Sequence, residues 1–232
     1  MADMSVELID HMGTDLSIVN AARVSFDKES DWEWYVPETG EVKDPDWDTL
    51  GRLSDKDSKL ITYLAKHKHK SPFNHSFLSF RVKAPLFTAR QLGKHEYLPW
   101  NEVSRRYVDS EPEFYIPKQW RKKADNVKQG SSEEVVEDLD LSLVYETFNT
   151  AYYSYQSLLY SGVAAEQARM VLPQAMMTTW IWSGSLYAFM KMCKLRLDPH
   201  TQKETQEVAK MIYAEIEALF PVSAKALLEY AE

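Results

Sequence analysis

Glycine is scarce and scattered in this chain, which limits how the fold can hold a nucleotide. Only seven glycines occur among 232 residues. A Rossmann turn needs the spacing G-x-G-x-x-G and a P-loop needs G-x-x-x-x-G-K, because glycine lets the backbone approach a phosphate closely. Neither pattern occurs in the sequence. Any bound nucleotide must therefore be held by arginine, lysine and serine side chains or by helix ends.

The composition is that of an ordinary globular protein. Hydrophobic residues make up 44% of the chain and charged residues 27%, and the net charge of -8 argues against a general nucleic-acid partner. The single cysteine cannot form an internal disulfide. The chain has no signal-peptide pattern and no apolar run of membrane length. We therefore expect a cytoplasmic protein with no membrane partner.

Two segments carry opposite charge. Residues 27–50 contain nine acidic residues and two lysines, together with Trp32, Trp34 and Trp47. Tryptophan side chains in an exposed linker would have no apolar surface to pack against. We therefore predict that this segment is an acidic insertion loop that packs on the domain surface. Residues 66–106 contain nine lysines and arginines against two glutamates. A basic region within an acidic protein favours a pocket for a small anion.

Hydrophobic periodicity and proline positions predict the following elements. We expect strands at residues 5–11, 77–83, 113–117 and 178–183. We expect helices at residues 17–26, 55–69, 86–97, 132–160, 164–172, 186–195, 201–219 and 222–230, with a loop over 118–132. No repeat and no clear linker interrupts the chain. The prediction is one α+β domain over residues 1–232, with a mixed or antiparallel sheet core and a helical C-terminal half.

The strongest local signal lies between residues 72 and 107. On the helix expected after Pro85, Gln91, Lys94 and His95 share one face through i, i+3 and i+4 spacing. Polar residues follow Pro99 in irregular chain, namely Asn101, Glu102, Ser104, Arg105 and Arg106. Two arginines beside a serine suit a phosphate. A solvent-exposed charged turn explains the same composition equally well.

Other candidates are weaker when taken alone. Arg169 follows Glu166 by three residues, which favours an intrahelical ion pair, and Arg196 stands where it could cap its own helix. The histidines near residue 69 are interleaved with lysines that would repel a metal ion. Cys193 has no neighbouring base in the sequence, so we expect a buried and inert thiol.

Several motifs in order nevertheless resemble one enzyme family. The segment KHEYLPWNEVSRRY, residues 94–107, resembles the RHRxxSxNExSxRY signature of the flavin-dependent thymidylate synthases. The upstream segments AARVSF, SPFNH and FRVKAPLFTARQ, and the downstream patterns ExARxVLP and LRxDxHxQ, are similar to that family as well. The resemblance spans residues 21–202.

The resemblance implies an enzyme that reductively methylates dUMP to dTMP. Methylene-tetrahydrofolate would donate the one-carbon unit, and FAD reduced by NADPH would supply the hydride. The family is usually a homotetramer with FAD between subunits, and it needs no cysteine nucleophile. Two alternatives stay open: a divergent enzyme that modifies carbon five of a pyrimidine nucleotide differently, for example by hydroxymethylation, and a nucleotide-binding homologue without activity.

The resemblance also implies roles for individual residues. We expect no metal site, because of the lysines that lie among the histidines. Arg196 is the expected catalytic residue, because a fixed cation would stabilise charge that develops on the uracil ring. The residues expected at dUMP are Gln91, Lys94, Glu102, Ser104, Arg105, Arg106, Arg169 and Arg196. Those expected at FAD are Ser25, His69, Ser71, Lys94, His95, Glu96, Asn101 and Glu102.

This sequence departs from the family pattern mainly on the flavin side. The RHR triplet has become KHE, so Lys94 loses the bidentate fork of arginine and Glu96 reverses a charge. In the signature, Pro99 replaces a serine and Arg105 a glycine, and in a later helix Ser185, Tyr187 and Lys191 stand at positions that differ in the family. Lys191 and Arg105 are candidates to compensate for the charge lost at Glu96.

Overall fold

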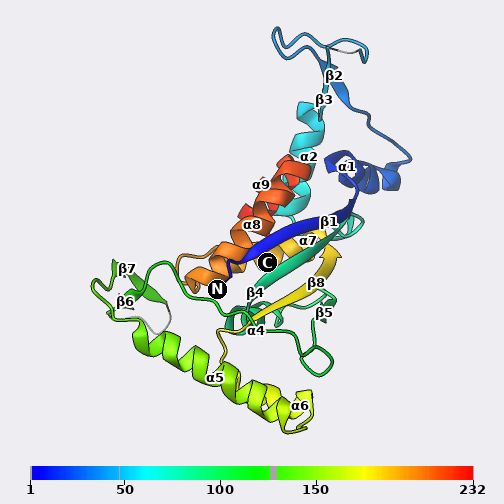
Figure 1. The fold of residues 1–232 in the computed structure, drawn as a ribbon. Helices are drawn as coiled ribbons and strands as arrows, with labels where there is room; N and C mark the ends of the chain where they lie inside the picture. The colour runs from blue at the N-terminus through cyan, green and yellow to red at the C-terminus, as the bar shows by residue number, and fades with distance from the viewer. Residues whose placement is uncertain (1, 47, 126–129, 232) are drawn as a thin grey trace.

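A four-stranded antiparallel sheet forms the centre of the protein. The computed structural model describes residues 2–46, 48–125 and 130–231. The sheet has the order β1-β4-β8-β5, with every neighbouring pair antiparallel (Figure 1). Its strands are β1 (Ser5–Met12), β4 (Phe77–Pro85), β8 (Met177–Ser185) and β5 (Trp100–Glu102). The predicted α+β class is therefore confirmed.

Alternating side chains on the central strands build the core. On β4, Leu78, Phe80 and Val82 are fully buried, while the residues between them face outward. Phe80 lies opposite Trp182 of β8, and both rings pack edge-on against Phe189 at 5.1 and 5.4 Å between centroids. This aromatic cluster fixes the register of the sheet against its helical layer.

The C-terminal half is helical, as predicted. Helices α7 (Leu186–Arg196), α8 (Lys203–Leu219) and α9 (Pro221–Tyr230) pack on one another, and α2 (Asp55–Lys66) packs on α9 (Figure 1). The remaining helices of this body are α1 (Asp15–Arg23), a 3₁₀ turn (Val24–Phe26), α3 (Ser71–Asn74) and α4 (Leu86–Leu92). Within the described ranges, no helix is both long and apolar enough to cross a membrane.

A second group of elements lies outside the sheet body and forms an arm. It comprises the hairpin β6 (Arg121–Lys123) and β7 (Ser131–Val135), α5 (Ser142–Tyr160), α6 (Ala165–Ala168) and a 3₁₀ turn (Arg169–Val171) (Figure 1). Tyr155 is the one buried residue of α5. Large apolar side chains of this arm lie in the open, including Leu143, Tyr153, Tyr160 and Met170. Such a face is typical of a surface that contacts another chain.

The acidic segment 27–50 contains more structure than the loop we predicted. It includes β2 (Glu33–Tyr35), which pairs with β3 (Leu50–Arg52) in a small hairpin held by an ion pair of 2.8 Å between Arg52 and Glu33. Trp32 packs against the core. Trp47 lies outside the described residues.

Several predicted boundaries are wrong for local physical reasons. The helix expected at 132–160 begins at Ser142, because residues before it form β7, whose acids face the basic β6, as in the 3.0 Å pair Lys122–Glu134. The same hairpin places strands in the predicted loop 118–132. The strand expected at 113–117 is a single bridge between Phe114 and Met176. Helix α4 ends at Leu92, capped by Gly93, rather than at residue 97.

Candidate active site

Arg196, the last residue of α7, hydrogen-bonds to Gln91 on α4 and to His95 in the chain that follows α4. Its Nε donates to Nε2 of His95 at 2.9 Å, and its Nη2 donates to the main-chain oxygen of Gln91 at 3.1 Å. The end of α7 is closed instead by the main-chain N–H of Leu197, which donates to the oxygen of Cys193. The interpretation of Arg196 as a cap of its own helix is therefore wrong.

His95 is held in its neutral form. Burial, with a further contribution from the nearby charges of Arg196 and Lys191, lowers the pKa of His95 to about 4. At neutral pH the Nε2 lone pair is therefore free to accept from Arg196, which leaves the ring proton on Nδ1. Burial also lowers the pKa of the Arg196 guanidinium, but arginine remains charged in proteins. The pair thus presents a fixed cation.

Arg196 borders a cavity of about 560 Å³, which we call the arginine cavity. It is lined by Gln91, Lys94, Gly130, Leu195, Arg196, Asp198, His200, Thr201 and Gln202. The Asp198 carboxylate already accepts from the main chain of His200 at 2.8 Å. With Lys94 and Arg196 facing it, the arginine cavity suits an anionic ligand. Lys94 and His95 lie beyond the end of α4, so the single helical face predicted for them is wrong, although Gln91 and Lys94 still share this cavity.

A second group brings the loop after β5 beside α6 and the 3₁₀ turn that follows it, and we call it the loop cluster: Ser104, Arg106, Glu166 and Arg169. Arg106 Nε lies 3.5 Å from a carboxylate oxygen of Glu166, and the Arg106 main-chain N–H donates to Ser104 at 3.3 Å. Arg169 donates to the main-chain oxygen of Glu166 at 3.2 Å. The Glu166 carboxylate therefore pairs with Arg106, and not with Arg169 as the helical spacing predicted.

Two other residues expected at dUMP are engaged elsewhere. The Arg105 guanidinium donates to main-chain oxygens of Ser110 and Glu111 within its own loop. Glu102 lies on β5, where its carboxylate accepts from Thr178 at 2.7 Å and from Trp100 at 3.2 Å. Residues 100–102 thus form an edge strand instead of the predicted irregular chain.

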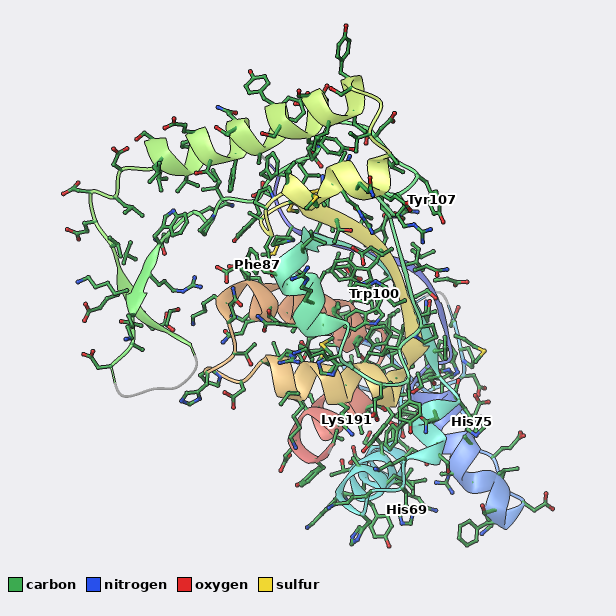
Figure 2. The ribbon with its side chains drawn as sticks, turned by 90° about the horizontal axis from the view of Figure 1, so that it is seen from below. His69, His75, Phe87, Trp100, Tyr107 and Lys191 are labelled. Carbon is green, nitrogen blue, oxygen red and sulfur yellow. The ribbon has the colours of Figure 1, made fainter. Side chains whose placement is uncertain are left out.

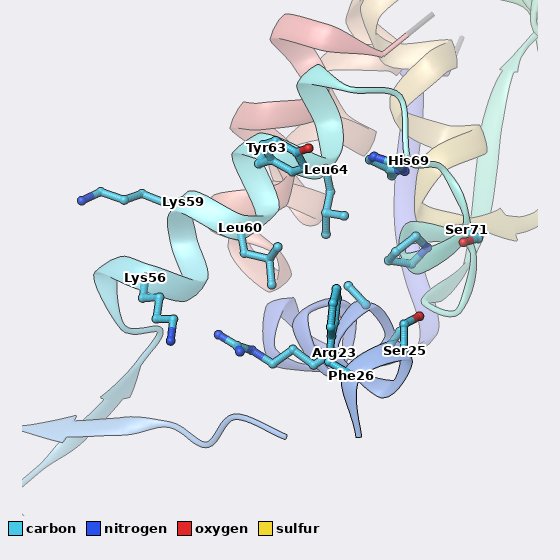
Figure 3. A pocket seen from close by; sticks show the side chains of 13 residues that line it. Arg23, Ser25, Phe26, Lys56, Lys59, Leu60, Tyr63, Leu64, His69 and Ser71 are labelled. Carbon is cyan, nitrogen blue, oxygen red and sulfur yellow. The ribbon is translucent and has the colours of Figure 1, made fainter. Parts of the chain in front are cut away.

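Three of the residues expected at FAD line a cavity of about 850 Å³ between α1 and α2, which we call the helix cavity. Ser25, His69 and Ser71 border it together with the side chains of Phe26 and Tyr63 (Figure 3). The Tyr63 ring stacks on that of His69, with 6.1 Å between centroids. Lys56 and Lys59 add positive charge to its wall, whereas the Arg23 guanidinium is paired with the buried Asp57 carboxylate. The helix cavity combines aromatic surface with cations.

Three further FAD candidates, Lys94, His95 and Glu96, line a cavity of about 650 Å³, which we call the lysine cavity. Lys70, Lys191 and Tyr187 line it as well, so three lysines face the single carboxylate of Glu96. Lys191 therefore stands where it can compensate for the reversed charge, whereas Arg105 does not border this cavity. Asn101 and Glu102 line neither the helix cavity nor the lysine cavity.

A close backbone contact fixes the loop that carries Lys94, His95 and Glu96. A Cβ built on Gly184 of β8 would lie 3.1 Å from the main-chain oxygen of Tyr97 and would clash with the Leu98 side chain. Leu98 is buried against the core and Tyr97 adopts a left-handed φ of 61°. The loop therefore lies directly against the central sheet, which holds its polar residues between the arginine and lysine cavities.

The predicted dUMP residues fall into two separate places in one chain. Gln91, Lys94 and Arg196 share the arginine cavity, and no residue of the loop cluster lines it. Figure 2 shows Tyr107, next to Arg106 in sequence, in the upper right of the view and Lys191 on α7 in its lower half. Neither the arginine cavity nor the loop cluster alone therefore contains all the residues expected at dUMP.

Sequence reasoning missed several residues of these cavities. Lys70, Asp198, His200 and Gln202 all line them without having been assigned a role. The last three belong to the LRxDxHxQ pattern, which was a usable signal. Cys193 is fully buried, as expected, and burial raises the pKa of its thiol. In the described part of the chain, no three histidine, cysteine or acidic groups are placed to hold a metal ion.

Comparison with known proteins identifies the family. Residues 7–222 match the family described as "Thymidylate synthase complementing protein". A flavin-dependent thymidylate synthase of Thermus thermophilus is 37% identical over 225 residues, covering 97% of this chain and 76% of that protein. The one from Thermotoga neapolitana is 35% identical over 226 residues, covering 97% and 91%.

A solved structure agrees with the sequence matches. The UMP/dUMP methylase PolB from Streptomyces cacaoi, bound with 5-Br dUMP, superposes with a TM-score of 0.80 and 30% identity, covering 99% of this chain and 97% of that one. The fold is thus shared over almost the whole length of both chains. The chain belongs to the flavin-dependent thymidylate synthase family.

Proposed function

We propose that this protein methylates carbon five of dUMP reductively to give dTMP. Methylene-tetrahydrofolate donates the carbon, NADPH is the source of the electrons, and the carbon-five hydrogen of dUMP leaves as a proton. The observation that carries the proposal is the Arg196 guanidinium, held by His95 and Gln91 at the edge of a cationic cavity. The family to which the chain belongs supports it.

Arg196 supplies the electrostatic part of the reaction. When carbon five of uracil acts as a nucleophile, negative charge builds on the ring and its carbonyl oxygens. A cation fixed beforehand stabilises that charge without reorganisation. Neutral His95 contributes by holding the guanidinium and adds no competing charge. Cys193, the one cysteine, is fully buried and does not serve as a nucleophile.

The loop cluster binds the nucleotide phosphate in this proposal. Arg106, Arg169 and Ser104 provide charged and neutral donors that suit a phosphate. Because these residues and the arginine cavity lie apart in one chain, a second copy completes each site. Homotetramer formation is supported by the exposed apolar residues of the arm, such as Tyr153 and Tyr160. Glu102 keeps the loop cluster on the sheet edge through Thr178.

The residues present fit FAD, which supplies hydride when bound. A flavin carries a broad apolar ring and an anionic diphosphate, and both the helix cavity and the lysine cavity pair aromatic walls with cations. Ser25, His69 and Ser71 would hold it in the helix cavity; Lys94, His95 and Glu96 would do so in the lysine cavity. Lys70 and Lys191 balance Glu96 there. Asn101 on β5 would reach FAD only across a subunit boundary.

Product mass tests the proposal directly. The purified protein is incubated with dUMP, methylene-tetrahydrofolate, FAD and NADPH, and the nucleotide is analysed by mass spectrometry. A methyl gain that requires all four additions is the expected result. A hydroxymethyl gain would replace the proposal with the divergent activity, and no product from a flavin-loaded protein would contradict it.

Substrate choice needs a parallel incubation with UMP. The structural neighbour is named as a methylase of both UMP and dUMP, so a ribonucleotide is a specific second candidate. Greater product from UMP than from dUMP would reassign the substrate while leaving the reaction unchanged.

A further inference from the structure

A line of polar side chains runs from the β6–β7 hairpin to the arginine cavity. Arg121 Nη2 donates to both carboxylate oxygens of Glu204, at 3.0 and 3.3 Å. Glu204 Oε2 also accepts from Nε2 of Gln202 at 3.0 Å. Gln202 Oε1 in turn accepts from Nε2 of Gln91, whose Oε1 accepts from the Thr205 hydroxyl at 3.2 Å. The line thus reaches Gln91, which lines the arginine cavity.

The carboxylate at the far end sets the direction of every bond in this line. An ionised carboxylate can only accept, so Gln202 must turn its NH₂ group toward Glu204 and its oxygen toward Gln91. Gln91 must then present its NH₂ group to Gln202 and its oxygen to Thr205. Glu204 is 5% exposed and Thr205 is fully buried, so water does not easily replace these partners.

This fixed direction has a consequence for base recognition. Each side-chain amide has two N–H donors and two acceptor lone pairs, and the line uses one of each on Gln91. The remaining donor and acceptor therefore keep constant places at the cavity. Uracil offers an acceptor oxygen at carbon four, where cytosine offers an NH₂ donor. An amide that cannot flip discriminates between the two bases, because the wrong base leaves polar groups unpaired.

We propose that Glu204 and Arg121 are positioning residues that lock the Gln91 amide in the orientation that selects uracil over cytosine. This inference rests on the proposed function, since it takes dUMP as the ligand of the arginine cavity. Arg121 acts by holding the Glu204 carboxylate in place, and its Nε donates to Ser131 of β7 at 2.6 Å. The hairpin thereby becomes a support for the site.

The test uses binding of dUMP and of dCMP to the full chain, measured by calorimetry. Gln202→Met removes the central link and keeps the Arg121–Glu204 pair, so no buried charge is stranded. Glu204→Gln keeps the size but allows Gln202, and then Gln91, to flip. Lys122→Gln is the matched control, because it breaks an exposed ion pair on the same hairpin.

We expect Gln202→Met and Glu204→Gln each to lower the preference for dUMP over dCMP at least fivefold. Because both act through one line, the double variant should lose no more preference than Gln202→Met alone. Lys122→Gln should match the parent. An equal loss of affinity for both nucleotides, or an unchanged preference, would overturn the inference and assign these residues a structural role.

Failure of the proposed function gives a different result. If the parent protein binds neither dUMP nor UMP, the function itself is wrong. If the parent prefers dUMP and Gln202→Met keeps that preference, only the positioning role is wrong. Circular dichroism of each variant verifies folding, and Gln202→Met alone decides the outcome if Glu204→Gln does not fold.

Discussion

Two arginines expected at the same nucleotide have very different surroundings. Arg196 is half-buried and bound by two hydrogen bonds to His95 and Gln91 within its own chain. The Arg106 side chain is 51% exposed and faces Glu166, itself 56% exposed, at 3.5 Å. The first arginine is organised before a ligand arrives, whereas the second holds an exposed ion pair that a phosphate can replace. The arginine proposed for the chemistry is thus more buried than the arginine proposed to bind the phosphate.

The largest effect should follow Arg196→Lys. Lysine keeps the charge but loses the planar fork that reaches both His95 and Gln91. We expect kcat to fall about 10²–10³-fold, as when a pre-organised electrostatic donor is removed. Arg81→Lys, on the exposed side of β4, is the control. Steady-state kinetics that show less than a tenfold loss would contradict the role of Arg196.

Arg106→Ala should act on binding rather than on the fold. A charge-assisted hydrogen bond contributes about 1.5–3 kcal/mol, so the affinity for dUMP should fall about 10–100-fold. The melting temperature should change little because the Arg106–Glu166 pair is exposed. Calorimetric titration with dUMP measures this loss of affinity.

Arg105→Ala sharpens the same prediction. Its guanidinium is bound to main-chain oxygens of Ser110 and Glu111, so we expect a smaller loss of dUMP affinity than for Arg106→Ala. A larger loss would mean that Arg105, and not Arg106, holds the phosphate.

The pH dependence of folding stability should reveal the protonation of His95 in the buried half of the site. His95 has a pKa of about 4 in the folded protein against an ordinary 6.5. Between these values the unfolded chain binds a proton that the folded chain does not, so acid favours unfolding. The stabilisation by neutral His95 is complete above pH 6.5 and is lost as the pH falls through 4.

Urea unfolding of the parent protein and of His95→Gln at several pH values checks this. The parent should lose stability relative to the variant between pH 6.5 and pH 4. A constant difference across that range would show that His95 is not held neutral.

The smallest effect belongs to Glu166→Gln. Glu166 competes with a phosphate for Arg106, so removing its charge should raise the affinity for dUMP about two- to fivefold, in line with an exposed pair of at most ~1 kcal/mol. A fall in affinity would indicate that Glu166 contributes a contact of its own to the nucleotide.

The sequence predicted the parts of the fold where periodicity and burial agree. The strand at Phe77–Pro85 alternates strictly and is half-buried, and α8 has a clear apolar stripe, so both were found. The hairpin Arg121–Val135 was missed, because its strands are short, polar and stabilised by cross-strand charges. Such pairs leave no hydrophobic pattern in the sequence.

Local position in the sequence predicted the wrong partners for two of the candidate site residues. Helical spacing predicted that Glu166 pairs with Arg169, and the position of Arg196 at a helix end predicted that it caps α7. Both contacts differ in the structure. Long-range partners such as His95 and Arg196, 101 positions apart, cannot be found by local periodicity. The family motifs nevertheless placed His95 among the residues expected at FAD and Arg196 among those expected at dUMP.

The most direct measurement is the absorption spectrum of the protein after incubation with FAD and desalting, recorded with and without dUMP. We expect a retained flavin band that shifts when dUMP is added, because both ligands would occupy adjoining parts of one site. A protein that retains no flavin, or a flavin band that dUMP leaves unchanged, would contradict the proposed site and its chemistry.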